Sequence, residues 1–249
     1  MARRLIELVE RWCDLRGVEA GPRPDPAALA AGFHSDPEAC RPGAEPADVA
    51  AWERRHGYDL PGGLCDWLAL SNGLFAEGPL IHPLFAIGPM VPFARVRGLL
   101  VSPESWFELG NPNVETVCLD LAYRLPGGDN PVFTSGDDER GTRPRLIADG
   151  FDAWFLRLLR EGGREYWFCP GFVDLGDPWL EHREHVPPPA LADRLRPIAS
   201  RVSLLIEEGV DDRAIASRFG IGAFDVEEIA RHVQHARPPI REAARGRRD

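Results

Sequence analysis

The chain has 249 residues, of which 44% are hydrophobic and 27% are charged, and it contains seven Trp and twelve Phe. This length and composition predict one or two domains with a substantial apolar core and exclude general disorder. The net charge is −10, and all 29 basic residues are Arg. The acidic balance argues against broad binding to nucleic acids or membrane surfaces, which needs a basic footprint. It suits a protein whose partner, if charged, is basic.

Cysteine usage and the N-terminus point to a reducing compartment. The five cysteines are odd in number and form no C-x-x-C pair: Cys13, Cys40, Cys65, Cys118 and Cys169. No disulfide framework or zinc module follows from this spacing, and reduced thiols are expected. The N-terminal segment is interrupted by Glu7, Glu10 and Arg11, so it is not a secretion signal. No stretch approaches the roughly 20 apolar residues that span a bilayer. We therefore expect a cytoplasmic protein that does not enter the membrane.

The first third of the chain predicts three helices. Apolar residues at helical spacing predict an amphipathic helix over 3–16, followed by a connecting region over 17–46 that is rich in Gly and Pro. Proline and glycine then mark a helical hairpin. Its first helix covers 46–56, and its second begins at Pro61 and ends at Asn72-Gly73.

In the middle third of the chain, the sequence pattern changes from the period of helices to that of strands. Short runs separated by Gly, Pro and Asn predict strands over 80–87, 99–101, 114–123, 132–135 and 145–148. In the third of these, alternate residues face opposite sides, which is typical of a half-buried sheet. A helix over 152–160 follows. Helical hairpin, antiparallel sheet and helix in this order predict an α+β fold.

The last third predicts a separate helical unit. The proline run at 187–189 is a stiff spacer, and three short helical patterns follow it. The chain thus divides into four predicted segments: an α+β domain with an N-terminal helix over 1–165, a proline-rich linker over 166–195, a small three-helix unit of helix-turn-helix type over 196–236, and an Arg-rich tail over 237–249.

The helical hairpin carries an ordered set of short motifs. They comprise an acidic residue in the first helix, a glycine at its end, a Leu-Pro turn, a Ser-Asn-Gly sequence that ends the second helix, and tryptophans that form an apolar contact between the two helices. The residues are Trp52, Glu53, Gly57, Leu60, Pro61, Trp67, Ser71, Asn72 and Gly73. The strand VCLDLAY, the strand NPVFTS, the loop GDDERG and the helix FDAWFLRLLREG follow in order. Over residues 45–162 this set resembles the SUKH superfamily, which takes in fungal regulators of cell-wall synthesis and bacterial immunity proteins.

The resemblance implies a scaffold and, by association, a function. The nine motif residues are expected to maintain the fold rather than to react, because they shape a tight hairpin and its apolar seam. Two features depart from the family pattern: Leu74 stands where many members have a second glycine, and the sheet region over 80–113 is longer and richer in proline. Bacterial members typically bind and block a toxin made by their own lineage, so neither catalysis nor a cofactor is expected.

Several residue groups could carry chemistry, and for each a structural interpretation is favoured. The segment 181–185, EHREH, has two His at i and i+3, a usable metal spacing, but a solvated charged loop is favoured. His232 and His235 have the same spacing on a plain helix face. Cys65 and Cys118 lie at core-like positions without a local His base. No metal site is predicted.

The C-terminal unit invites a DNA-binding interpretation, which its charges oppose. Its last predicted helix would be the recognition helix, but it carries Asp225, Glu227 and Glu228 with Arg231 as its basic residue. Carboxylates facing phosphates would be repelled. A structural or docking bundle is favoured, and binding to nucleic acid is not expected.

These observations predict a non-enzymatic protein-binding module. The leading hypothesis is an immunity protein that binds a basic toxin domain of nuclease type through its acidic exterior. Charge and loop position alone suggest the contacts: Glu77, Asp129, Asp137, Asp138 and Glu139. The acidic run among them could hold a divalent ion, but a solvated loop is favoured. The alternative is a regulatory adaptor whose C-terminal unit binds DNA or a second protein. The sequence leaves the oligomeric state open.

Overall fold

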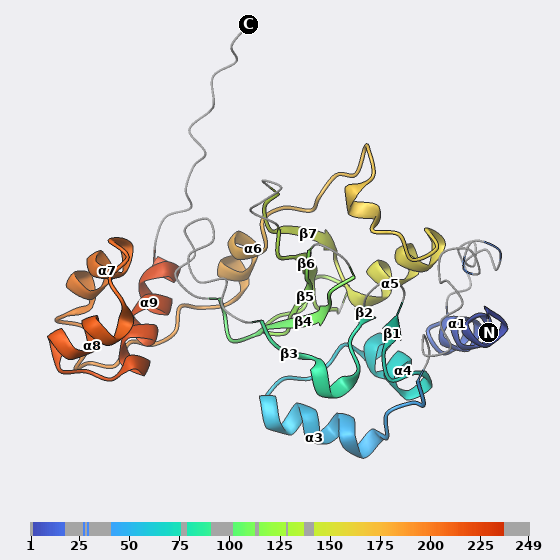
Figure 1. Ribbon diagram of the computed structural model, residues 1–249, viewed down its shortest axis with the longest axis horizontal. Helices are drawn as coiled ribbons and strands as arrows, with labels where there is room; N and C mark the ends of the chain where they lie inside the picture. Colours follow the sequence, from blue (N-terminus) through green and yellow to red (C-terminus); the bar gives the residue numbers. More distant parts are fainter. Residues whose placement is uncertain are drawn as a thin grey trace, which may run out of the picture. The chain divides into compact units, whose positions relative to one another are not determined.

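The computed structural model describes residues 2–17, 27, 29, 41–75, 79–90, 102–112, 115–127, 129–136 and 142–236 (Figure 1). The chain forms two compact units. Unit 1 comprises Met1–Val91 and Glu104–His182, and unit 2 comprises Pro92–Pro103 and Arg183–Asp249. Helices and antiparallel sheets confirm the predicted α+β class.

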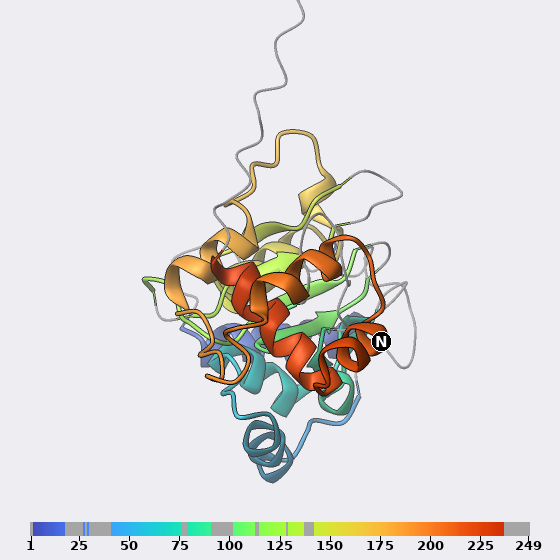
Figure 2. The ribbon, with the colours of Figure 1, turned by 90° about the vertical axis from the view of Figure 1, so that its left-hand side faces the viewer.

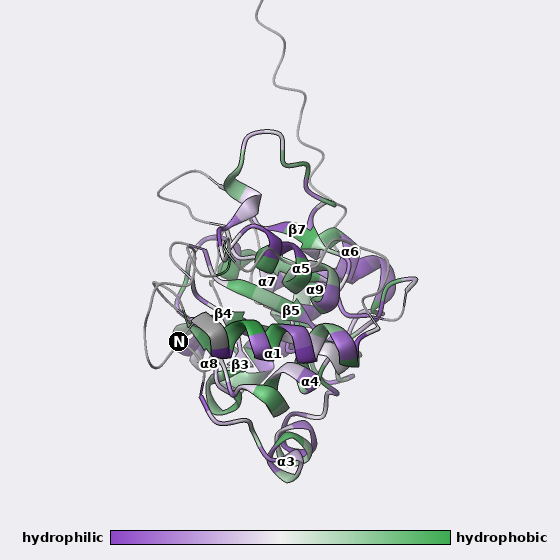
Figure 3. Ribbon diagram, turned by 90° about the vertical axis from the view of Figure 1, so that its right-hand side faces the viewer, coloured by the Kyte–Doolittle hydropathy of each residue, from purple (hydrophilic) through white to green (hydrophobic). Residues whose placement is uncertain are grey.

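Four helices of unit 1 follow the predicted pattern: α1 (Ala2–Leu15), α3 (Pro46–His56), α4 (Gly62–Leu70) and α5 (Phe151–Arg160). Gly57 ends α3 in the left-handed conformation with φ 75°, a geometry that glycine adopts without strain. Figure 3 shows hydrophobic and hydrophilic residues alternating along α1, as an amphipathic helix requires.

The main sheet has five antiparallel strands in the order β3-β4-β5-β6-β7. Its strands are β3 (Gly88–Pro89), β4 (Trp106–Gly110), β5 (Val117–Asp120), β6 (Val132–Thr134) and β7 (Arg145–Ala148). A second sheet pairs β1 (Leu74–Phe75) with β2 (Pro79–Ile81). The strand predicted over 80–87 is divided into β2 and the 3-10 helix η1 (Leu84–Ala86), because Pro83 interrupts it. The strand predicted over 99–101 lies outside the described residues.

The sheet is buried on both faces, which corrects the expectation of a half-buried sheet. All four residues of β5 are buried, and so are four of the five residues of β4. No local pattern predicts β4, because a strand covered on both sides has no alternation of polar and apolar residues.

One face of the sheet belongs to the main core, where α1, α4 and α5 meet. Phe155 of α5 contacts the rings of Trp12 and Trp67 edge-on, at centroid distances of 4.9 and 4.8 Å. Phe107 and Leu119 reach the same core from β4 and β5. The other face carries Trp106 and Phe133, whose ring centroids are 4.6 Å apart.

The predicted linker over 166–195 differs from the structure at residues 166–182, because these residues belong to unit 1. They include the 3-10 helix η3 (Tyr166–Phe168) and most of α6 (Pro178–His185). Tyr166 and Trp167 are fully buried, and burying rings of this size holds the segment against the domain. Residues 187–189 of the proline run are exposed.

Unit 2 confirms the predicted three-helix unit. Its helices are α7 (Ala199–Glu207), α8 (Asp212–Phe219) and α9 (Ala223–Ala236), drawn in orange to red in Figure 2. Asp211 caps α8 by accepting hydrogen bonds from the N–H groups of Arg213 and Ala214. The unit has its own apolar core, which also includes Leu191 and Leu195 from the segment before α7.

Candidate functional site

The motif residues of the helical hairpin make structural hydrogen bonds. Glu53 Oε1 accepts a hydrogen bond from Leu60 N at 3.0 Å, which closes the turn between α3 and α4. Pro61 is the N-cap residue of α4. The indole N–H of Trp52 donates to the carbonyl of Ile87 at 2.9 Å, so that α3 is fixed to the chain that enters β3.

The Ser-Asn-Gly motif connects α4 to the segment that follows it. Asn72 Oδ1 accepts a hydrogen bond from Leu84 N at 2.7 Å, and Ser71 Oγ donates to the carbonyl of Gly73 at 2.9 Å. Gly73 has φ 108°, and a Cβ there would approach the carbonyl of Ile81 at 3.2 Å. Trp67 is fully buried in α4. Through these contacts the motif joins the end of α4 to the segment that follows it.

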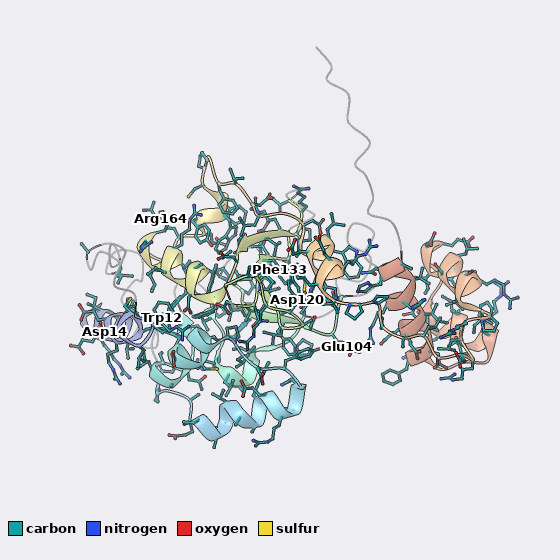
Figure 4. All side chains as sticks on the ribbon, turned by 180° about the vertical axis from the view of Figure 1, so that it is seen from behind. Trp12, Asp14, Glu104, Asp120, Phe133 and Arg164 are labelled. Atoms are coloured by element: carbon teal, nitrogen blue, oxygen red, sulfur yellow. The ribbon has the colours of Figure 1, made fainter. Side chains whose placement is uncertain are left out.

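A network of polar contacts surrounds Asp120 at the end of β5 (Figure 4). Its Oδ1 accepts hydrogen bonds from Ser105 Oγ at 2.7 Å and from Ala122 N at 3.0 Å. Its Oδ2 accepts one from Trp106 Nε1 at 2.9 Å and lies 2.6 Å from His182 Nδ1. A carboxylate only accepts, so this geometry assigns a hydrogen to Nδ1. A carboxylate offers about four lone-pair sites to hydrogen-bond donors, and the four partners of Asp120 occupy them.

His182 enters the network from α6, where it is buried. Its ring stacks on Trp179 at 5.6 Å and meets the rings of Trp106 and Tyr123 edge-on at 6.3 Å. The expectation of a solvated loop over 181–185 was therefore wrong for His182. No local sequence signal could have paired it with a residue 62 positions earlier.

The Asp120–His182 pair links several elements of unit 1. The ring is enclosed by aromatic side chains, and the carboxylate joins β4, β5 and α6 through the four contacts described above. Asn130 extends the network by donating to the carbonyls of Asp120 and Tyr123. Asp120 thus holds these elements in place.

The two candidate thiols are poor nucleophiles. The pKa of Cys65 is raised to about 11, chiefly by burial and in smaller part by the Glu53 carboxylate. Burial also raises the pKa of Cys118, with a smaller contribution from Glu108. Both thiols are therefore protonated near neutral pH, and a protonated thiol is not the reactive form.

The acidic contacts suggested by charge fall largely outside the described residues: Glu77, Asp137, Asp138 and Glu139. Asp129 is described, and its carboxylate is turned toward the protein. Its Oδ1 accepts a hydrogen bond from Asn130 N at 2.8 Å, and its Oδ2 accepts one from Asp152 N at 3.4 Å in the first turn of α5. Asp129 therefore caps α5.

Residues 172–176 form an extended segment along β7, which we call the ribbon. Leu146 of β7 donates a backbone hydrogen bond to Gly176 and accepts one from Leu175. Residues 173 and 175 are more exposed than 172, 174 and 176. Val173 and Leu175 are 80% and 57% exposed, and Phe168 nearby in sequence is 39% exposed. We call these three side chains the ribbon face; they are not among the contact residues predicted from the sequence.

Two arginines support the ribbon from the domain side. The guanidinium of Arg145 lies 5.4 Å from the ring centroid of Phe168 and 5.8 Å from that of Phe172. Arg157 lies over Tyr166 and Phe172 at 4.2 and 5.3 Å. Such cation–π contacts stabilise the segment.

In unit 2, one face of α9 is covered by the segment that precedes α7. Arg194 makes two hydrogen bonds to Asp225, at 3.0 and 2.6 Å. Ala192 N donates to Glu228 Oε1 at 2.8 Å, and His232 Nδ1 lies 3.0 Å from the carbonyl of Pro189. Asp225 and Glu228 of the would-be recognition helix therefore bind the chain itself. At the start of α9, Phe224 is 86% exposed.

Among the residues described, no three His, Cys, Asp or Glu side chains are placed to hold a metal ion. None of the helices in this part of the chain has the length and apolarity to cross a membrane. Comparison with protein-family models, with curated proteins and with solved structures finds no match to this chain.

Proposed function

We propose that this chain is a non-enzymatic protein-binding protein, and specifically an immunity protein that neutralises a toxin by direct binding. One contrast carries the proposal. The Asp120–His182 pair is buried, and all four hydrogen bonds around it meet on the Asp120 carboxylate, whereas apolar side chains such as Val173 are exposed to solvent. Exposed apolar groups on a folded domain are typical of protein-interaction surfaces.

The resemblance to the SUKH superfamily supports the finer part of the proposal. The residues that carry it occupy positions where their chemistry is used: Glu53 closes the hairpin, Asn72 holds Leu84 and Gly57 adopts a positive φ. These contacts stabilise the hairpin, and they give a physical reason for the motif residues to occur in a scaffold of this type. The toxin-binding role then follows from what bacterial members of that superfamily typically do.

Net charge supports a basic partner. A chain at −10 attracts a cationic protein over a distance of about one Debye length, roughly 8 Å at physiological salt. Nuclease domains bind polyanions through cationic clefts, so an acidic protein both approaches such a cleft faster and competes with the nucleic acid.

A binding titration with charge-reversal variants tests the proposal. The probe is a basic toxin domain of nuclease type, and the first variant reverses Asp137, Asp138 and Glu139 to Arg. A matched variant reverses three exposed acids elsewhere, Glu184, Asp193 and Glu208, and so has the same net charge. The proposal expects a loss of at least tenfold in affinity for the first variant and a much smaller loss for the second. Equal losses would mean that these acids act only through net charge, and no binding by the natural chain would refute the proposal.

A second candidate function is a regulatory adaptor, favoured by the separate core of unit 2 and by the exposure of Phe224. Truncation separates the two functions. The cut belongs before Pro189, because residues 189–195 pack on α9. Toxin neutralisation should survive this truncation, whereas adaptor function should be lost.

A further inference from the structure

Glu115 is a fully buried carboxylate that lies just before β5. Its Oε1 accepts a hydrogen bond from Thr142 Oγ1 at 2.5 Å, and its Oε2 lies 3.7 Å from Nη2 of Arg145, the first residue of β7. Burying a charge is costly unless the charge is paired and hydrogen-bonded. Both partners of Glu115 lie at or just before the start of β7, so the carboxylate fixes the end of the connection from β6 to β7.

The next residue, Thr116, holds the other end of the same connection. Its backbone N–H donates to Ser135 Oγ at 3.1 Å, and its carbonyl accepts a hydrogen bond from Ser135 N at 2.9 Å. Ser135 directly follows β6. Residues 115 and 116 therefore bind the chain on both sides of residues 137–141, at Ser135 before them and at Thr142 after them.

A glycine lets these two ends approach each other closely. Gly136 has φ 71°, and a Cβ there would lie 2.6 Å from the carbonyl carbon of Arg143 and 2.7 Å from the nitrogen of Pro144. No side chain fits so close to backbone atoms, and glycine also adopts the positive φ without strain. The two ends are thus held by close backbone packing as well as by the hydrogen bonds to residues 115 and 116.

We propose that Glu115 positions the acidic segment, residues 137–139, for binding to a basic toxin domain. The inference rests on the proposed function, in which the acids of this segment are contacts. A segment whose two ends are fixed has fewer conformations to lose, so its binding costs less conformational entropy. Glu115 is a positioning residue, because it is buried and acts through Thr142.

The test alters Thr142, because a substitution of Glu115 would leave Arg145 without its buried counter-charge. Thr142→Val removes the hydroxyl that donates to Glu115 and keeps both the shape of the side chain and the net charge. Affinity for a basic toxin domain of nuclease type should fall by about threefold to tenfold. The dissociation rate should account for the loss, since an unchanged net charge leaves the association rate unchanged. Thr142→Ser keeps the hydroxyl and should bind as the natural chain does.

Thr134→Val is the matched control. Thr134 is a buried residue of β6, and within the described part of the chain its Oγ1 makes no hydrogen bond. The change removes the same chemical group from the same sheet without touching the contacts of Glu115, so affinity should not change. Equal losses in Thr134→Val and Thr142→Val would overturn the positioning role.

A double-mutant cycle separates positioning from general damage to the fold. The second change neutralises the acidic segment with Asp137→Asn, Asp138→Asn and Glu139→Gln. In this neutralised chain, Thr142→Val should cause no further loss of affinity, because the side chains that are positioned no longer carry charge. A loss of the same size in the natural and the neutralised chain would assign the effect of Thr142 to the fold and refute the inference.

The same titrations distinguish a failure of this inference from a failure of the proposed function. If the natural chain does not bind the basic toxin domain, the proposed function fails and the inference fails with it. If the natural chain binds and the neutralised chain binds equally well, the acids are not contacts and the inference is overturned. If neutralisation weakens binding but Thr142→Val does not, the positioning role of Glu115 alone is overturned. Circular dichroism melting curves confirm that each variant is folded.

Discussion

His182 of α6 lies 2.6 Å from the Asp120 carboxylate of β5, across 62 positions of sequence. Both side chains are buried, and Ser105 and Trp106 donate to the same carboxylate from the chain that enters β4. A single acidic residue therefore connects two strands and a helix of unit 1, and this network explains why α6 packs on the sheet.

The first prediction concerns Asp120. In Asp120→Asn an amide NH₂ replaces one of the oxygens, so two of the four donors meet another donor. Disrupting a buried charged network in this way costs about 3–5 kcal/mol. Urea denaturation monitored by tryptophan fluorescence measures it. The control is Asp193→Asn at an exposed position, where a change within about 0.5 kcal/mol is expected. A loss below about 1 kcal/mol for Asp120→Asn would contradict the structural role.

The second prediction compares two glycines of the hairpin. Gly57 has φ 75° with no atom near its missing Cβ, so the strain in Gly57→Ala is conformational and should destabilise the chain by about 1–2 kcal/mol. In Gly62→Ala, within α4, the nearest atom is the flexible end of Arg16 at 3.4 Å. That change should stabilise the chain by up to about 1 kcal/mol. Thermal melting of both variants checks the opposite signs, and a common sign would be inconsistent with the turn geometry.

The third prediction concerns the reactivity of Cys65. Because burial raises the pKa of this thiol to about 11, its thiolate fraction is very small near neutral pH. It increases about tenfold with each pH unit up to that value. The rate of alkylation by iodoacetamide, followed by peptide mass spectrometry between pH 7 and pH 10, should rise in parallel. Cys169, which is exposed, serves as the control in the same sample. A rate at Cys65 that levels off below pH 9 would show an activated thiol and would reopen an enzymatic function.

The fourth prediction concerns whether residues 189–195, which precede α7, belong to the folded core of unit 2. Leu195 lies before α7 but is fully buried in the helical core, so Leu195→Ala should destabilise the unit by about 2–4 kcal/mol. Leu204 is exposed on α7, and Leu204→Ala should change stability by no more than about 0.5 kcal/mol. Hydrogen exchange of the α9 amides reports the stability of this unit directly. Similar protection in the two variants would place residues 189–195 outside the folded unit.

Local signals explain which elements could be predicted from the sequence. Pro46 and Gly57 bound α3, and Asp211 and Gly220 bound α8, because caps and left-handed glycines act within a few residues. In contrast, β4 has no alternating pattern to reveal it, since both of its faces are covered. Burial in a folded structure depends on what packs against a segment, and that information is not local.

The candidate sites show the same difference between features set by local sequence and features set by non-local packing. The structural roles of Glu53 and Asn72 were expected from a short motif. The Asp120–His182 pair depends on α6 returning to the sheet, and the ribbon face depends on the pairing of residues 175 and 176 with Leu146. Asp129 was selected for its charge alone, and its carboxylate caps α5. Charge predicts what a surface attracts but not which carboxylates face the solvent.

A stoichiometric inhibition titration tests the central claim most directly. The activity of the toxin domain is measured while this protein is added, and the masses of both chains are determined before and after. Neutralisation by direct binding predicts that inhibition is complete at one equivalent, with both masses unchanged and activity restored when the complex is dissociated. Complete inhibition by a small fraction of an equivalent, or a change in the mass of the toxin, would contradict the claim, because only a catalyst acts in that way.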